Sequence, residues 1–262
     1  VIVLTLAYFL IRRIGSETAP SEPSQTEAPS TDAFGSVVQT TQPPVLSGSC
    51  DLLFGCGEGD RVDFLIRTVV DLDEKTVRVF AIPTDLTLSY AGAQASVHTV
   101  FAEGGASALA SALGGYYSDS FDRYYFCSPN DFADVTKLLG NAEIHVKKEV
   151  TYVREDVSLH LQAGKHSLSG EELYDYLVYA DTGDALLSAQ SEAFAAMLRA
   201  YCVPATVGEG ETLFSRIINK AQSNITAFDF AEVQPLLEQM AQNTDMQYLS
   251  CGIAPLAGGE DA

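Results

Sequence analysis

The sequence predicts an α/β domain in which a mixed central β-sheet lies between helical layers. Two runs rich in β-branched and aromatic residues, Phe64–Val70 and Thr76–Ile82, flank the polar turn Asp71–Lys75, a pattern typical of a β-hairpin. Both runs carry apolar residues on either face, so we expect the hairpin in the centre of a sheet that is covered on both sides. The remaining strand-like runs are separated by helical segments, and this order favours a mixed sheet between helices.

Length and charge limit the class of protein. The chain has 262 residues, of which 47% are hydrophobic. It can therefore bury one sizeable core, and a single domain of about 210 residues is expected once the N-terminal segment is set aside. Its 15 basic and 35 acidic residues give a formal net charge of −20. A surface this negative repels nucleic acid, which excludes DNA or RNA binding as the main role.

The N-terminal residues predict a membrane anchor and a tether. Val1–Ile11 is a continuous apolar run followed by Arg12 and Arg13. The run is shorter than the about 20 residues that span a bilayer, so residues 1–13 are interpreted as the C-terminal part of an anchor helix. A signal peptide would need a small-residue cleavage site where the arginines stand. Residues 14–49 are rich in Ser, Thr and Pro and are expected to form a disordered tether, because they lack the apolar surface that offsets ordering entropy.

The first half of the folded domain, which we expect at residues 50–256 ahead of a tail at 257–262, alternates strands and helices. Gly104 and Gly105 lie inside a helical run and are expected either to break it, because glycine destabilises a helix interior, or to let another part of the chain pack closely. The expected elements are a buried strand Leu52–Gly55, the central hairpin, a helix Ser96–Leu113, a strand Arg123–Cys127, a helix Asp131–Leu139 and a strand Ile144–Val153.

The second half of the domain is expected to be mainly helical. Ser169 and Glu172 form a capping-box pattern, in which the serine bonds a helical N–H and the glutamate reaches back to the cap. The helix that starts there is followed by another with an apolar face. The expected elements are helices Glu171–Tyr179 and Asp184–Tyr201, and a helical tail Glu211–Gln242 that is broken near Asn224–Thr226 and at Pro235.

The open end of the hairpin carries two carboxylates. Asp63 lies just before the first strand and Asp85 just after the second. The two ends of an antiparallel pair lie side by side, so both residues are expected at one rim of the sheet. Paired carboxylates there would form a metal or acid/base site. The alternative is that Asp63 caps a strand start and Asp85 starts a turn.

The cysteines and histidines show no metal-ligand spacing. Five cysteines occur without a CxxC pair. Cys202 and Cys251 are the preferred candidates for a bridge because both lie in the C-terminal part, although two buried thiols explain the sequence equally well. Of the four histidines, His98 alone falls near the proposed rim, where a packed or surface role is expected.

Six short stretches follow one another along the chain in a recognisable order. They are Leu52–Gly55 (LLFG), Arg61–Asp63 (RVD), Ile82–Asp85 (IPTD), Phe101–Gly105 (FAEGG), Gly164–Glu172 (GKHSLSGEE) and Asn224–Thr226 (NIT). Together with the predicted anchor and tether, they resemble the LytR-CpsA-Psr family, the membrane-anchored enzymes that attach glycopolymers to the bacterial cell wall. The order and spacing of the stretches carry this resemblance.

The resemblance implies both a fold and a chemistry. Members of the family move a polymer-bearing phosphate from a polyprenyl pyrophosphate carrier to a sugar hydroxyl of peptidoglycan, usually with Mg²⁺. The resemblance therefore implies a domain on the extracytoplasmic side of the membrane, with the cell wall and a polyprenyl-linked glycopolymer or lipid as partners. Holding a pyrophosphate and neutralising its leaving charge requires arginines and a divalent ion.

The chain departs from the family at the arginines. Thr84 stands where the family typically reads Ile-Pro-Arg-Asp, and Tyr176–Ala180 replaces Tyr-Val-Arg-x-Arg without either arginine. Asp184–Ser191 matches Asp-x-x-Arg-x-x-Arg-Gln, again with neither arginine. The aspartate that usually closes the first strand falls near Gly57, with Glu58 or Asp60 as alternative residues in its place. Five arginine positions are therefore replaced.

Four matching polar positions are retained. The resemblance implies catalytic roles for Arg61, Asp85 and Asp184, and a role in binding the metal for Asp63. Each donor that stabilises the transferring group contributes several kcal/mol, about as much as one oxyanion donor. Since Arg61 alone does not offset five losses, we expect lost or much reduced catalysis.

Three functions remain open at this stage. The first is a family member with little or no catalysis that binds or scaffolds beside an active paralogue. The second is an active glycopolymer phosphotransferase with a rearranged phosphate site. The third is a metal-dependent hydrolase that uses Asp63 and Asp85, which ranks last because no nucleophile or histidine cluster accompanies them.

Overall fold

The computed structural model describes residues 48–154, 157–226, 234, 238, 240–242 and 245–256, and its centre is a six-stranded mixed sheet. The strand order is β11-β6-β1-β2-β3-β12, with the predicted hairpin β2/β3 in the interior of the sheet as expected. β6 is parallel to β1 and β12 is parallel to β3, whereas the other neighbours are antiparallel. The strands are β1 (Ser49–Glu58), β2 (Arg61–Asp71), β3 (Thr76–Ile82), β6 (Arg123–Cys127), β11 (Gln222–Ser223) and β12 (Gln247–Ile253).

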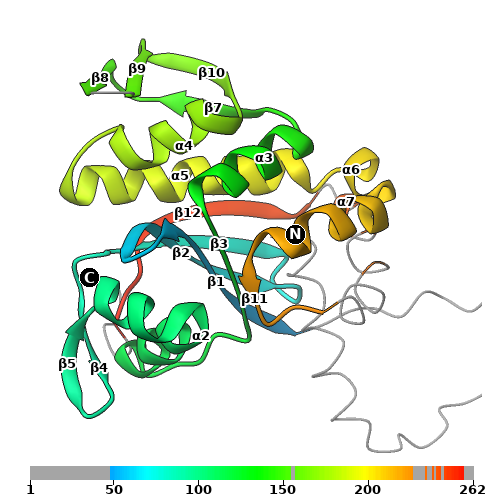
Figure 1. The fold of residues 1–262 in the computed structure, drawn as a ribbon. Coiled ribbons are helices and arrows are strands. Elements are labelled where there is room, and N and C mark those ends of the chain that lie inside the picture. Colours follow the sequence, from blue (N-terminus) through cyan, green and yellow to red (C-terminus); the bar gives the residue numbers. More distant parts are fainter. Residues whose placement is uncertain are drawn as a thin grey trace, which may run out of the picture.

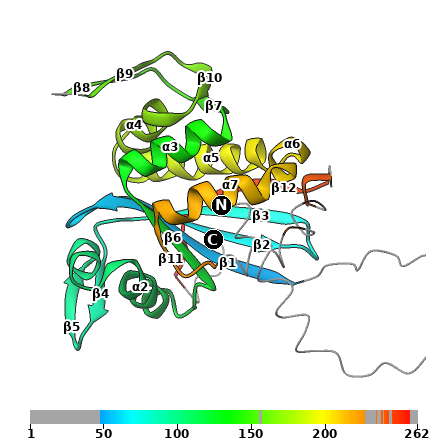
Figure 2. The ribbon, with the colours of Figure 1, turned by 45° about the vertical axis from the view of Figure 1, so that its right-hand side comes forward.

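Different helices cover the two faces of this sheet (Figures 1 and 2). Leu65 of β2 faces one layer, whereas Phe64 and Ile66 face the other, because successive side chains of a strand point to opposite sides. The smaller layer is α2 (Val97–Tyr117) with the hairpin β4 (Thr87–Tyr90) and β5 (Ala93–Ser96). The larger layer consists of α3 (Pro129–Leu139), α4 (Gly170–Tyr179), α5 (Gly183–Tyr201) and α7 (Gly210–Ile217).

An aromatic cluster fills the space between the sheet and the larger layer. The ring of Phe54 lies 4.9 Å from that of Phe194, and the ring of Phe64 lies 5.4 Å from that of Phe132, in each case between centroids. All four side chains are buried. Aromatic rings in tilted or edge-to-face contact add to the stabilisation from burial itself, so this cluster fixes α3 and α5 against β1 and β2.

The predicted strand Ile144–Val153 is wrong as a single element. It consists of β7 (Ala142–Val146), which pairs with β10 (Gly164–Leu168), and β8 (Val150–Arg154), which pairs with β9 (Val157–Leu161). The two strands are separated at Lys147 and Lys148, whose ammonium groups bind Glu192 and Asp181. The predicted alternation of buried and exposed residues is present in β7. The two lysines, however, end this strand before β8 begins.

The predicted capping box is also not formed. Ser169 is the cap residue of α4, but its side chain makes no capping hydrogen bond. The N–H of Gly170 instead donates to Oγ1 of Thr136 in α3, at 2.9 Å. Glu171 binds Lys137 of the same helix, with a nitrogen–oxygen distance of 2.7 Å. Contacts with α3 therefore replace the local cap.

The expected break in α2 is confirmed at Gly105, where φ is 66° and ψ is −167°. Left-handed φ is accessible to glycine because it lacks a Cβ atom. The N–H of Ala106, freed by this break, donates to Oε1 of Gln222 at 3.0 Å. The break thus connects α2 to the edge strand β11.

The predicted helical tail is only partly correct. The helix α6 (Pro204–Gly208) precedes this tail. Within residues 211–242 the described helical residues belong to α7, to the short 3-10 helix η1 (Ile218–Lys220) and to positions 234, 238 and 240–242, whereas residues 222–223 join the sheet as β11. The edge strand β12 was not predicted at all. Both strands depend on neighbours that are distant in the sequence, which local patterns do not report.

Several predictions of the N-terminal part lie outside the described residues, namely the anchor at 1–13 and almost all of the tether at 14–49. No helix within the described ranges is both long and apolar enough to cross a membrane. The predicted bridge between Cys202 and Cys251 is not formed, and no disulfide joins any of the five cysteines, all of which are described. Cys202 is buried and its side chain hydrogen-bonds with that of Tyr248.

We expect Phe64→Ala to lower the free energy of unfolding by about 3–5 kcal/mol, because it removes a fully buried ring from the aromatic cluster and leaves a cavity. Urea unfolding of the full chain, followed by tyrosine fluorescence, measures this loss. Val153→Ala is the matched control, since its side chain is exposed and its removal should change the stability by less than about 0.5 kcal/mol. Equal effects of the two substitutions would contradict this view of the core.

Candidate functional site

The rim at the start of β2 contains an ion pair that a tyrosine completes. Nε of Arg61 lies 2.6 Å from Oδ1 of Asp63, and the hydroxyl of Tyr174 donates to Oδ2 of Asp63 at 2.9 Å. The Asp63 side chain is 4% exposed, whereas that of Arg61 is 59% exposed. The carboxylate is therefore held inside the protein, with its guanidinium partner reaching the surface.

The core of the domain positions Tyr174. Its ring lies 6.4 Å from the ring of Phe64 and 6.3 Å from that of Phe132, between centroids. These contacts dock α4 on the aromatic cluster and fix the phenol beside Asp63. The sequence does not point to Tyr174 as a site residue, because no spacing pattern links it to Asp63, which lies 111 positions away.

Burial shifts the pKa of the Asp63 carboxyl group in one direction, and its two partners, Arg61 and Tyr174, shift it in the other. Burial raises the pKa of Asp63, while the hydrogen bond from Tyr174 and the charge of Arg61 lower it, and the net pKa is raised. The Asp63 carboxylate raises the pKa of Arg61. Burial, with a further contribution from Asp63, raises the pKa of Tyr174. At neutral pH Tyr174 is therefore a protonated donor and Arg61 a cation already paired with an acid.

The surroundings of this pair are aromatic and neutral rather than cationic. The rings of Tyr179 and Tyr152 stack with centroids 4.2 Å apart and planes 12° apart. The positive charge of Arg61 acts on Tyr179, opposing the burial that raises the pKa of this phenol. His98 lies at the rim as predicted, and its Nδ1 accepts a hydrogen bond of 3.1 Å from the N–H of Val62. This bond fixes Nδ1 as the unprotonated nitrogen.

Of the four predicted site residues, Arg61 and Asp63 are the two that an ion pair joins. Asp85 follows β3 at the same end of the hairpin as Asp63, since the last paired residues are Leu65 and Ile82. Asp85 is exposed, and no hydrogen bond or ion pair between described residues joins it to Asp63. Asp184 is exposed in the first turn of α5, likewise without such a bond to Asp63. The catalytic roles of Asp85 and Asp184 stay predictions.

Two other arginines lie toward the opposite end of β1. Arg67 binds Asp51, near the start of β1, with Nε 2.8 Å from Oδ2, and it also pairs with Asp119. Arg123 donates from Nη1 to the carbonyl oxygen of Asp122 at 2.9 Å. Among the described residues, Arg61 is the only arginine with an ion pair to Asp63.

The positions that hold arginine in the family carry no other cationic side chain in this protein. Gln190 is buried and donates from Nε2 to the carbonyl oxygen of Leu177 at 2.8 Å, so it belongs to the α4–α5 packing. Ala180 is also buried, and Leu187 packs against the core. The other two positions are half-buried and uncharged, Thr84 and Val178.

These residues do not fit a magnesium ion. Both oxygens of Asp63 are engaged, one by Arg61 and the other by Tyr174, and the guanidinium would repel a cation. The strand β1 has a bulge between Cys56 and Gly57, and a Cβ atom at Gly57 would overlap the carbonyl oxygen of Arg61. The family's aspartate is therefore excluded from this backbone. The described residues contain no group of three or more His, Cys, Asp or Glu side chains arranged for a metal.

We expect Tyr174→Phe to raise the pKa of Asp63, because it removes a hydrogen bond that favours the ionised carboxylate. A pH titration followed by ¹³C NMR of the aspartate carboxyl carbons measures the shift. Tyr179→Phe is the matched control and should leave this pKa unchanged, since Tyr179 does not bond to Asp63. An unchanged or lowered pKa in Tyr174→Phe would show that the phenol does not stabilise the charge.

The fold and the sequence can now be compared with those of known proteins. TagV of Bacillus subtilis (strain 168), a polyisoprenyl-teichoic acid–peptidoglycan teichoic acid transferase, is 24% identical over 127 residues. This match covers 46% of the chain but only 32% of the length of TagV. The crystal structure of B. subtilis TagV superposes with a TM-score of 0.62 at 18% identity, over 74% of this chain and 80% of that one.

Two further solved structures have the same fold. A putative transcription regulator from Eubacterium siraeum DSM 15702 has a TM-score of 0.66 at 14% identity, over 83% of this chain and 88% of that one. TagT bound to LIIa-WTA has a TM-score of 0.57 at 18% identity, over 80% and 83% of the two chains. The model of the LytR_cpsA_psr family matches residues 36–251. The chain therefore belongs to the LytR_cpsA_psr family.

Proposed function

We propose that this protein is a membrane-anchored component of cell-envelope biogenesis that binds a polyprenyl-linked glycopolymer and has lost most of the family's phosphotransfer activity. The observation that supports this proposal is the Arg61–Asp63–Tyr174 arrangement, in which the arginine at the rim is neutralised by a buried carboxylate. The names of TagV and TagT supply the class of ligand, because TagV is a teichoic acid transferase and TagT was solved with LIIa-WTA.

The electrostatics of phosphotransfer explain why a single paired arginine is insufficient. The charge that develops on a pyrophosphate leaving group must be neutralised, and removal of one preorganised donor typically reduces a rate by about 10²–10³-fold. Asp63 already neutralises the charge of Arg61, so a phosphate that binds the exposed N–H groups of Arg61 would share this one cation with a buried carboxylate. The neutral residues at Thr84, Val178 and Ala180 offer no replacement.

The residues at the rim can instead hold uncharged groups. Arg61 is 59% exposed and keeps N–H donors beyond the one that faces Asp63, and Tyr179 offers part of an aromatic face. Such groups suit hydroxyls of a bound glycopolymer without providing the cationic environment for its transfer. The proposal includes an anchor at residues 1–13, with the domain on the extracytoplasmic side beside an active paralogue.

The test compares transfer by the full chain with that of TagV. Each protein, in detergent, is incubated with a polyprenyl-pyrophosphate-linked glycopolymer, peptidoglycan and Mg²⁺, and release of the polyprenyl phosphate is measured. We expect a rate at least about a thousandfold below that of TagV, because several donors are missing together. Binding of the polyprenyl-linked polymer should remain detectable without turnover.

Arg61→Gln provides the matched control for this assay. If the site is inactive, the variant and the natural chain should release phosphate at the same background rate. Transfer within about tenfold of the TagV rate that Arg61→Gln abolishes would contradict the proposal and favour an active transferase with a rearranged phosphate site.

A further inference from the structure

Two buried cysteines face each other at the carboxyl ends of the parallel strands β1 and β6. Cys56 of β1 and Cys127 of β6 are partners in the register of these strands, and both belong to the core beneath the larger layer. Neighbouring strands lie about 4.8 Å apart, which is within the range of about 4.4–6.8 Å between Cα atoms that a disulfide bond requires. The backbone therefore places the two residues where a bridge can form.

The side chains of this pair also contact each other. The thiol of Cys56 hydrogen-bonds with that of Cys127. Sγ of Cys127 lies 4.0 Å from the carbonyl oxygen of Gly55, the residue before Cys56, so this sulfur atom lies against β1. All five cysteines are described, and no other two of them are partners in the register of neighbouring strands. The contact is therefore specific to Cys56 and Cys127.

The two cysteines differ in their access from solvent. Cys127 is 3% exposed and contributes to the lining of a cavity of about 540 Å³ beyond the ends of the two strands. Cys56 is 0% exposed and is not part of that lining. Burial raises the pKa of the Cys56 thiol, which makes this residue a poor first nucleophile. An oxidant that enters the cavity therefore reacts first with Cys127.

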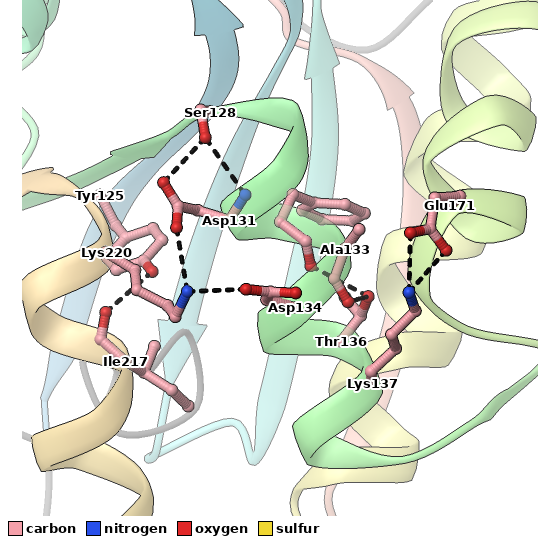
Figure 3. Close-up of polar contacts among 11 residues, drawn as sticks. Tyr125, Ser128, Asp131, Ala133, Asp134, Thr136, Lys137, Glu171, Ile217 and Lys220 are labelled. Atoms are coloured by element: carbon pink, nitrogen blue, oxygen red, sulfur yellow. Dashed lines mark hydrogen bonds and ion pairs between the residues drawn. The ribbon is translucent and has the colours of Figure 1, made fainter. Parts of the chain in front are cut away.

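The charges at the cavity favour a small, uncharged oxidant. Figure 3 shows the ammonium of Lys220 beside α3, where it lies 3.1 Å from Oδ1 of Asp131 and 2.8 Å from Oδ2 of Asp134. Two carboxylates thus neutralise this ammonium, and Glu58 in the lining adds a further negative charge. An anionic disulfide such as oxidised glutathione is repelled by these charges. Hydrogen peroxide is neutral and scarcely larger than water, so it suits the cavity.

We propose that Cys56 and Cys127 form a reversible disulfide bond when hydrogen peroxide enters this cavity. The peroxide oxidises the thiol of Cys127 to a sulfenic acid and releases a water molecule. The sulfur of Cys56 then attacks the sulfur of Cys127, an S–S bond forms, and the hydroxyl of the sulfenic acid leaves as a second water with the proton of Cys56. One peroxide is reduced to two waters while two thiols are oxidised. The modification does not depend on the proposed function.

The bridge connects the rim to the start of α3. Cys56 immediately precedes the bulge that leads into the β1–β2 turn, where Glu58 pairs with Arg61. Cys127 immediately precedes Ser128, the cap residue of α3. A covalent bond between the two cysteines therefore fastens the segment that carries Arg61 to the segment that begins α3.

The test maps the oxidation of the natural cysteines in the full chain in detergent. The folded protein is treated with hydrogen peroxide, the peroxide is removed with catalase, and the remaining thiols are alkylated with iodoacetamide in urea. Digestion without a reductant, followed by mass spectrometry, then locates the bridge. We expect a linked pair of peptides that contain Cys56 and Cys127, lighter by two hydrogen atoms than the two free peptides. Dithiothreitol should return both residues to alkylatable thiols.

Cys202 is the control within the same chain, because it is buried but its side chain bonds to Tyr248 and not to another thiol. At the lowest peroxide concentration that links most of the chains, Cys202 should still be alkylated. The map is repeated in Cys251→Ser, which removes the exposed thiol and with it bridges between two chains through that residue. The bridge between Cys56 and Cys127 should be retained in this variant.

Two substitutions test the order of the steps. In Cys56→Ala the sulfenic acid of Cys127 has no partner and should be trapped by dimedone, whereas in Cys127→Ala no dimedone adduct should form at Cys56. Circular dichroism shows whether each variant is folded, and the map of the natural chain decides the inference if one is not. Full alkylation of both cysteines after peroxide treatment would overturn the inference, as would a bridge between other cysteines or a product that dithiothreitol does not reduce.

Discussion

The burial of Asp63 with Arg61 as its partner is the constraint on which the candidate site depends. The carboxylate sits inside the protein because Phe64, its neighbour in the chain, and Tyr174, which donates to it, belong to the same aromatic core. A charge at this depth needs a counter-charge and a donor, and Arg61 and Tyr174 supply them. Their engagement leaves the rim with little positive potential, so the chemistry of the site follows from the packing of the core beneath it.

The surrounding backbone is adapted to this neutral site. The bulge at Gly57 brings the β1–β2 turn against the strand, which leaves no space for an acidic side chain at that position. Gln190 and Ala180 are buried in the contacts of α4 and α5, so restoring arginines there would require repacking and not simple substitution. The family fold is thus retained, with TM-scores of 0.62 and 0.57 to TagV and TagT, while Gln190, Ala180 and Leu187, at positions that hold arginine in the family, pack inside the protein.

Sequence patterns predicted the central hairpin, the α2 break at Gly105 and most helices, because each depends on local periodicity or on glycine. They failed where distant residues decide the outcome. Thr136 of α3 replaces the expected cap at Ser169, Lys147 and Lys148 divide one expected strand into two, and β12 forms only because β3 offers an edge. At the site, the motif around Arg61 was visible in the sequence, but the bond from Tyr174 was not, since it depends on how α4 docks.

The most direct test of this account is a titration of the full chain with inorganic pyrophosphate, followed by ³¹P NMR with and without Mg²⁺. The account predicts no saturable binding below about 10 mM, because Arg61, the one arginine that the described part of the chain pairs with Asp63, is neutralised there. Saturable binding with a Kd of about 0.1 mM or lower, which is lost in Arg61→Gln, would show that the site still binds a diphosphate. This result would contradict the account.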